Sequence, residues 1–328
     1  MIRSPHAWAV AVRRPDGDIE TETHDLPRLS ARSNWAKVPF IRGVLVLGES
    51  LTLGFKALTW SADKAAEGEA ENERVRLEGI IETARGPLAG LRRKRAGKRL
   101  ENPGEISRGE MGIAMFGALV VFVGVFMLLP LGGAKLAEEA AGGENVLVFT
   151  VAEGVIRVLL FVGYIWAIGR SKEIARVFQY HGAEHKSIWA YEAGDPLDVE
   201  SVQKYQTMHP RCGTSFLIIV VLLAVLVFTL LGLTEPPLWW TISSRIVLVP
   251  LIAGIAYELL KASATASWLH ALSWPGIQLQ RITTKEPDDG MVEVAISSLL
   301  ASLTQPEVDE VIERGNVCEP ALRATHHG

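Results

Sequence analysis

Two histidines at helical spacing are the residues best placed to do chemistry in this chain. His181 and His185 stand four residues apart in the run YHGAEHK, and on a helix such residues project from one face, so both imidazoles can reach one metal ion. Glu184 completes the order H-x-x-E-H, the inverted form of the zinc-hydrolase helix, in which the glutamate acts as general base. The motif predicts His181 and His185 as metal ligands and Glu184 as the catalytic residue. The same spacing also fits a polar helix face or a hydrogen-bonded histidine pair.

A second segment, HPRCGTS, brings two more metal-capable groups. His209 and Cys212 lie in a short turn, and with the first pair they place four of the chain's ten His and Cys residues within 32 positions. A tetrahedral site needs three or four donors and one helix supplies two, so we expect His209 and Cys212 as further ligands of a divalent transition metal, with Zn²⁺ preferred. Cys212 also precedes the start of an apolar helix, where a thiolate is stabilised, which fits a ligand, a nucleophile or a buried small residue.

Four other charged residues, in three places along the chain, bear on candidate sites. Glu258 lies at the predicted cytoplasmic end of an apolar segment and is a reserve ligand. Glu192 shares a helical face with His185, but it would lie roughly 10 Å farther along the axis, too far for the same ion. Glu153 and Arg157, in the middle of an apolar segment, have the favourable i,i+4 order and are predicted to form an intramembrane ion pair; a structural clasp is preferred over a transport path.

Composition indicates a membrane protein with substantial parts outside the bilayer. The chain has 328 residues, of which 48% are hydrophobic and 21% charged, and its net charge is −4. An acidic balance without basic or aromatic binding motifs excludes nucleic acid as the expected partner. The two cysteines, Cys212 and Cys318, form no disulfide framework. The sequence has no phosphate-binding loop, serine-hydrolase elbow or dinucleotide fingerprint, which disfavours ATP-driven transport, serine hydrolysis and nicotinamide chemistry.

Four segments are apolar and long enough to span a bilayer, which takes about 20 helical residues. They are Met111–Pro130, Val146–Gly169, Gly213–Leu233 and Ser244–Leu260. Lys and Arg are dense before the first segment and between residues 170 and 211, but sparse at 131–145 and 234–242. The positive-inside rule then predicts a multi-pass protein of the inner (cytoplasmic) membrane, with both termini and the metal site in the cytoplasm.

The remaining segments complete a mainly α fold with a cytoplasmic α-rich domain. Alternating apolar residues in 7–13 and the turn signal PDG predict a small N-terminal β-hairpin. The run 40–60 is apolar but carries charges, so we interpret it as an interfacial or re-entrant helix before a charged, solvated stretch at 61–110; a full span is the less favoured alternative. The predicted organisation is hairpin segment 1–38, interfacial helix and charged region 39–110, spans 111–169, metal-site segment 170–212, spans 213–260 and cytoplasmic tail 261–328.

The runs YHGAEHKSIWAYE, HPRCGTSFL, AYELLK, PGIQLQRITTKEP and EVAI extend these motifs over most of the chain. Together they resemble the YqhQ-like family of predicted metal-dependent membrane proteins. The resemblance implies a metal-dependent enzyme and supplies no substrate. Such proteins usually open with a Gly-rich segment of the type GGQAVMEGVMMR, whereas this chain opens with MIRSPHAWAV, which leaves open whether about ten residues precede Met1.

The function best supported by the sequence is metal-dependent hydrolysis at the cytoplasmic membrane face, of a peptide or a lipid-linked substrate. Membrane lipids are the expected partners. The alternative is a non-catalytic assembly factor, chaperone or transporter in which the metal has a structural role. The two differ in coordination, because a structural site is closed by four protein ligands and a catalytic site keeps one position open.

Overall fold

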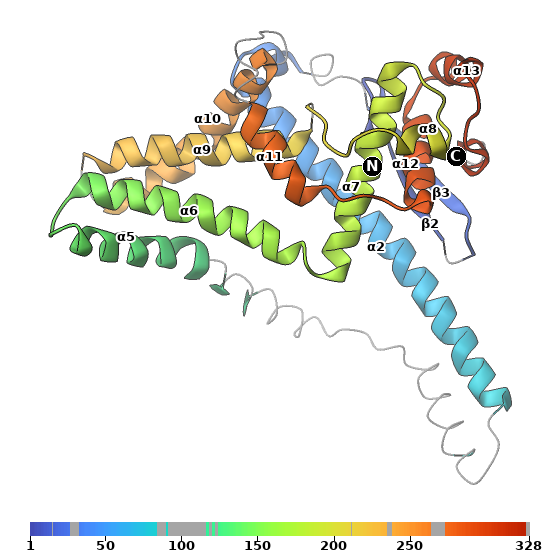
Figure 1. Cartoon of the computed structure of the whole chain (residues 1–328), viewed down its shortest axis with the longest axis horizontal. Helices are drawn as coiled ribbons and strands as arrows, with labels where there is room; N and C mark the ends of the chain where they lie inside the picture. The colour runs from blue at the N-terminus through green and yellow to red at the C-terminus, as the bar shows by residue number, and fades with distance from the viewer. Residues whose placement is uncertain are drawn as a thin grey trace.

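The structure, a computed structural model, describes residues 1–14, 16–26, 33–83, 90, 116–117, 120–121, 124–210, 212–234, 238–263 and 273–325. Over these residues the chain is mainly helical, with a small antiparallel sheet at its N-terminus. Figure 1 shows a compact part that contains both termini, a layer of apolar helices that extends away from it, and one long helix that projects in another direction. The expected mainly α fold with an N-terminal hairpin is confirmed.

The sheet has three strands in the order β1 (Ile2–Arg3), β2 (Ala7–Arg13) and β3 (Ile19–Asp25). β2 and β3 form the predicted hairpin, paired from Ala7 with Asp25 to Arg13 with Ile19. Gly17 takes a positive φ of 96° in the turn, a conformation that glycine adopts without strain. The sheet is anchored by buried Trp8 and Val10, which pack against Leu53 and Ala57 of a later helix.

The compact part is organised around helix α12 (Asp289–Ser302), which is buried on nearly every side. It packs between the sheet and three helices, α7 (Lys172–Ala193), α8 (Val199–Gln203) and α14 (Glu319–Thr325). A capping box at Thr304 and Glu307 then starts α13 (Gln305–Arg314). Helix α12 also contacts α7, the helix of the predicted metal-site segment.

The apolar layer contains α5 (Leu129–Ala140), α6 (Val146–Ile168), α9 (Gly213–Gly232) and α10 (Leu238–Ser263), with α11 (Trp274–Thr283) against α9. α6 and α9 meet at two glycines, because a Cβ on Gly154 would lie 2.6 Å from Val225 and one on Gly232 would lie 2.6 Å from Thr150. Among the described helices searched, α6 and α9 are long and apolar enough to cross a membrane, and few of their residues are buried. Two such helices suggest membrane association.

Of the first predicted span, Met111–Pro130, nine of 20 residues lie outside the described part of the chain. A short π-helix, η2 (Gly124–Leu128), precedes α5, and the chain continues as α5 to Ala140, where the sequence analysis expected a loop from residue 131. Pro130 stands at the start of α5, where its missing N–H is tolerated and its fixed φ favours the helix. The expected loop is therefore shorter than predicted.

Helix α2 (Ile41–Thr83), which follows a 3₁₀ turn η1 (Asn34–Lys37), is also longer than predicted. Residues 61–110 were predicted as a charged, solvated stretch, with no helix assigned to it. The structure continues the helix through its first 23 residues, from 61 to 83, where most of the described side chains are exposed. Alanine, glutamate, lysine and arginine are strong helix formers, and pairs such as Arg74 and Glu78 stabilise an exposed helix at i,i+4 spacing. The first part of the predicted charged stretch is therefore helical, up to Thr83.

Candidate metal centre

Helix α7 carries both predicted histidine ligands on one face. Ser171 caps its first turn by accepting a hydrogen bond from the Ile174 N–H, and Gly194 ends it with a left-handed φ of 80°. The rings of His181 and His185, one turn apart, have centroids 4.4 Å apart. The expected i,i+4 juxtaposition is present in a helix whose two ends are well defined.

Cys212 reaches these histidines from the turn that precedes α9. It is the N-cap of that helix, and its side chain accepts a hydrogen bond from the Thr214 N–H. The Cys212 Sγ lies 3.2 Å from His181 Nε2. One donor atom from each of His181, His185 and Cys212 lies within 4.8 Å of the other two. Two segments separated by a turn and a short helix thus bring three metal-capable atoms together.

Backbone carbonyls fix the orientation of both rings. His181 Nδ1 is 2.9 Å from the Thr283 carbonyl oxygen, and His185 Nδ1 is 2.5 Å from the Thr207 carbonyl oxygen. A carbonyl only accepts, so each Nδ1 carries a hydrogen and the neutral ring keeps its lone pair on Nε2. This is the arrangement in which metal-ligating histidines are commonly held.

Gly182 explains how the Thr283 carbonyl comes so close to α7. A Cβ on Gly182 would lie 2.1 Å from the Lys285 carbonyl oxygen, so no larger residue fits without moving that segment. The Lys285 N–H donates to the Phe178 carbonyl across the same contact, at 2.9 Å. The glycine between the two histidines therefore lets the chain after α11 lie directly on α7 and orient His181.

The electrostatics of the cluster favour the ligating form of the thiol. Burial by itself would raise the pKa of Cys212, but hydrogen bonds from His181 and His185 outweigh it and lower the pKa to about 5. Burial would likewise lower the pKa of His181, while the Cys212 hydrogen bond and charge raise it to about 9. Without a metal the pair is a thiolate next to an imidazolium, and a metal ion would take the place of the shared proton.

His209, a predicted ligand, lies next to the cluster without joining the group of three. Its ring centroid is 5.8 Å from that of His185, and its Nε2 is 3.3 Å from a Glu192 carboxylate oxygen. The ring packs edge-on against Trp189, with centroids 4.7 Å apart. Glu192, judged too distant for the ion from helix geometry, contacts His209 instead.

Gln280 of α11 holds the turn that carries His209 and Cys212. Its amide accepts from the His209 N–H at 2.8 Å and donates to the His209 carbonyl at 2.9 Å and to the Ser215 hydroxyl at 3.1 Å. The side chain is fully buried. Sequence analysis missed Gln280, and it missed the Thr207 and Thr283 carbonyls, because no residue spacing marks a buried glutamine or a backbone oxygen as part of a site.

The remaining predicted site residues lie elsewhere. The Glu184 carboxylate forms an ion pair with the Met1 amino group and does not point at the cluster, although its charge contributes to the raised pKa of His181. Glu258 pairs with Arg42 and accepts from the Phe40 N–H at 3.4 Å, at the contact of α10 with α2. Glu153 and Arg157 form an ion pair within α6.

Three donors of this kind can hold a transition metal ion. Two imidazole nitrogens and a thiolate suit Zn²⁺ and other borderline or soft ions, and tetrahedral coordination by them leaves one position for a fourth ligand. The donor set, the fixed ring tautomers and the low thiol pKa agree on this point.

Comparison with known proteins gives a family and no activity. Residues 38–305 match a family described as "Protein of unknown function (DUF1385)". The chain is 32% identical over 305 residues to "Uncharacterized protein YqhQ" of Bacillus subtilis (strain 168), covering 91% of this chain and 87% of that protein. No solved structure matches. The family match spans the helices that carry the cluster, so the chain belongs to the DUF1385 family and is a relative of the uncharacterised protein YqhQ.

Proposed function

We propose that His181, His185 and Cys212 bind one transition metal ion, most simply Zn²⁺, and that the protein is a metal-dependent hydrolase at the cytoplasmic face of the membrane. The observation that carries the proposal is the orientation of the two rings. Both Nδ1 atoms are engaged by backbone carbonyls, so both Nε2 lone pairs remain for the position beside the Cys212 sulfur. Metal-ligating histidines are commonly held in this way, with an acceptor on the ring nitrogen that does not bind the metal.

Hydrolysis is favoured over a structural role because three protein donors leave a coordination position open. A bound Zn²⁺ would polarise a substrate carbonyl or lower the pKa of a water molecule to about 7. Two carboxylates of α7 are candidate proton acceptors. Glu192 contacts His209, whose ring centroid lies 5.8 Å from that of His185, whereas Glu184 pairs with Met1 and would have to turn away from it to reach the cluster.

A membrane location supports a peptide or lipid-linked substrate. The cluster lies where the compact part meets α9, which is one of two helices in the described part of the chain that are apolar and long enough to cross a bilayer. Our proposed topology has four spans with both termini in the cytoplasm, as the distribution of Lys and Arg indicates. Reporter fusions after residues 105, 138, 190, 238 and 280 should read inside, outside, inside, outside and inside. An external signal at 190 would remove the site from the cytoplasm.

Metal content of the purified full chain is the direct test. Wild-type protein should contain about one transition metal ion per chain, and His181→Ala, His185→Ala and Cys212→Ser should each lose it, because each removes a donor. Cys318→Ser is the matched control, since Cys318 is also buried but lies away from the cluster, in the compact core. Full occupancy in the His181→Ala, His185→Ala double variant would refute the site.

Activity is tested separately on metal-loaded protein, with quenched fluorogenic peptides and with acyl-ester lipids in mixed micelles. Turnover by the wild type that is lost in Cys212→Ser and retained in Cys318→Ser is the expected result. Glu184→Gln and Glu192→Gln then identify the proton acceptor, because the amide keeps the shape and cannot take a proton. The variant that keeps metal and loses turnover marks the base.

A structural metal is the second candidate, and one observation favours it. The cluster joins α7 of the compact part to the turn that starts α9, so an ion there would tie two regions of the molecule together. In that case X-ray absorption should show four protein ligands, with His209 as the fourth. Three protein ligands and one light oxygen scatterer would favour catalysis.

A further inference from the structure

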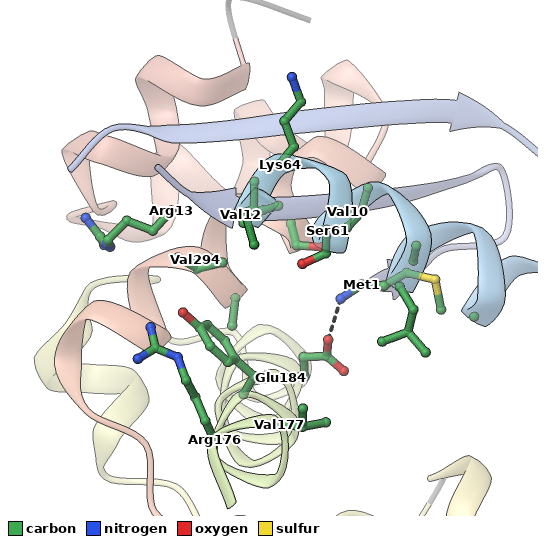
Figure 2. A pocket seen from close by; sticks show the side chains of 18 residues that line it. Met1, Val10, Val12, Arg13, Ser61, Lys64, Arg176, Val177, Glu184 and Val294 are labelled. Carbon is green, nitrogen blue, oxygen red and sulfur yellow. Dashed lines mark hydrogen bonds and ion pairs between the residues drawn. The ribbon is translucent and has the colours of Figure 1, made fainter. Parts of the chain in front are cut away.

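A cavity separate from the metal cluster lies on a neighbouring face of α7. It has a volume of about 680 Å³, is open on one side, and is lined by Met1 and by residues of β2, α2, α7 and α12. Figure 2 shows the side chains that line it, with Arg13 and Arg176 toward one end and Glu184 with Met1 toward the other. Its volume is within the range of sites for ligands of several hundred daltons.

The walls of the cavity are mainly apolar. Val10 and Val12 come from β2, Ala57 and Leu58 from α2, Val177 from α7 and Val294 from α12. Such walls favour an apolar body over a sugar or a nucleotide, because a polar ligand would lose hydrogen bonds with water and gain few in return.

The charges that line the cavity leave one cation without a counter-ion. Arg13 pairs with Glu293, Lys64 pairs with Glu20 and Glu67, and Glu184 pairs with the Met1 amino group. Arg176 has no carboxylate partner anywhere in the described part of the chain.

The guanidinium of Arg176 lies 5.7 Å from the centre of the Tyr180 ring, one turn away on α7. The Tyr180 hydroxyl likewise has no hydrogen-bond partner among the described residues. An arginine and a hydroxyl without partners at one end of an apolar cavity suit a single anionic group.

Helix α2 supplies an apolar path to the cavity. Leu58, which lines it, is 65% exposed, and Leu51 and Phe55, at 65% and 73% exposed, continue the same face of the helix. Residues spaced by three and four form one stripe along a helix. The stripe leads from the cavity along the segment predicted to lie at the membrane interface, the direction from which an acyl chain would arrive.

We propose that this cavity binds a single-chain anionic amphiphile, with its carboxylate or phosphate on Arg176 and Tyr180 and its acyl chain between β2, α2 and α12. The site is distinct from the metal cluster and its occupancy does not depend on a metal. Whether the anionic group is a fatty carboxylate or the phosphate of a lysolipid is decided by comparing the two as ligands.

The experiment uses the purified full chain in a neutral maltoside detergent. Binding of tritiated palmitate is measured at equilibrium, with lysophosphatidate and hexadecanol as competitors. A photoreactive palmitate, with its diazirine near the end of the chain, maps the contact by mass spectrometry. We expect saturable binding, competition by the anions and little by the alcohol, and crosslinks to residues of β2, α2 or α12.

Two variants and a control locate the site. Arg176→Gln should weaken binding by about tenfold or more, because it removes a charge-assisted contact. Ser61→Phe should also weaken it, because Ser61 lines the cavity and a ring there occupies part of the volume. Lys172→Gln removes a charge from α7 one turn before Arg176, outside the cavity lining, and should bind like the wild type. Arg176 is exposed, so its replacement is compatible with folding.

Several results would overturn the proposal. Binding that does not saturate means partition into micelles, and equal competition by hexadecanol removes the role of the anion. Equal losses in Arg176→Gln and Lys172→Gln indicate general charge attraction. Because the assay measures binding to metal-free and metal-loaded protein alike, failure here leaves the metal proposal intact, and loss of metal in Cys212→Ser leaves palmitate binding intact.

Discussion

Helices α12 and α9 are both strongly apolar, yet the side chains of α12 are buried within the protein and many of those of α9 are exposed. In α12, Val292 and Ile296 are fully buried by the sheet and by neighbouring helices. In α9, Leu226 and Leu230 remain 54% and 57% exposed. The difference lies in length and in polar groups. α12 has 14 residues, too few to cross a bilayer, and its Ser298 donates to the Ala9 carbonyl of the sheet. α9 has 20 residues with an uninterrupted apolar middle.

This comparison shows that apolar character alone does not identify a membrane segment. A helix that is apolar all round lies either at the centre of a folded core or across a membrane. A charged substitution lowers the stability of the fold in the first case and disfavours membrane insertion in the second. A charge in α12 would meet packed protein, whereas a charge in α9 would meet lipid if that helix spans the membrane. Charged substitutions in α12 should therefore be detected by thermal unfolding, and those in α9 by extraction from membranes.

The largest effect is expected from Ile296→Asp in α12. A carboxylate at a fully buried position without a partner leaves an uncompensated charge in the core, which should cost more than about 4 kcal/mol of unfolding free energy. Thermal unfolding and limited proteolysis measure it. Ile312→Asp in α13 is the control, because Ile312 is 48% exposed and its change should have little effect. Similar losses in both variants would contradict a core built around α12.

In α9 the matched change is Leu226→Asp. If α9 lies in lipid, a charge at its centre should disfavour insertion by roughly 2.5 to 3.5 kcal/mol and reduce the fraction that resists alkaline extraction from membranes. The compact part should keep its fold, so protease-resistant fragments that contain α12 should remain. Extraction that is unchanged in the variant would argue against α9 as a span.

The features that could be predicted from the sequence are those that depend on residues close together in the chain. The turn Pro15-Asp16-Gly17 predicted the hairpin, the i,i+4 spacing placed His181 and His185 on one face, and the approach to an apolar helix singled out Cys212. The four-span count and the orientation of the termini remain predictions, because the described helices that could span number two.

Features that depend on contacts between distant residues, or on the balance of helix propensity and charge, could be predicted less well. Helix α2 continues to Thr83 through a charged stretch to which the sequence pattern assigned no helix, because good helix formers and ion pairs stabilise a helix there. His209 was expected at the metal on spacing alone. The Gln280 clamp on its backbone and the Trp189 ring instead place it beside Glu192. No pattern in a single sequence reveals which of two neighbouring donors a turn will direct inward.

A smaller effect is expected from a substitution of Gly182, where α7 contacts the segment after α11. Gly182→Ala places a Cβ 2.1 Å from the Lys285 carbonyl, so the segment that orients His181 must move. We expect a loss of stability of about 1 to 3 kcal/mol and weaker metal binding, since ring orientation contributes to affinity. Gly163→Ala in α6 is the control, because its Cβ would meet nothing within 4 Å. Metal titration of both variants checks the prediction, and equal affinities would separate the glycine from the site.

The smallest effect concerns the charged pair inside the apolar layer. Glu153 and Arg157 form an ion pair one turn apart in α6, so neither charge faces its surroundings alone. Glu153→Gln and Arg157→Gln should each destabilise the protein in detergent, because each leaves a partly buried charge without its partner on the helix. Both side chains also have contacts beyond the pair, so a coupling of about 1 kcal/mol is expected and the double variant should recover much of the loss. Thermal unfolding of the wild type, the two single variants and the double variant gives the coupling energy.

If the double variant is as stable as the wild type but inactive in the hydrolase assay, the pair belongs to a functional path and the structural clasp is refuted. If the double variant shows the sum of the single losses, the two charges act independently and the clasp is equally refuted.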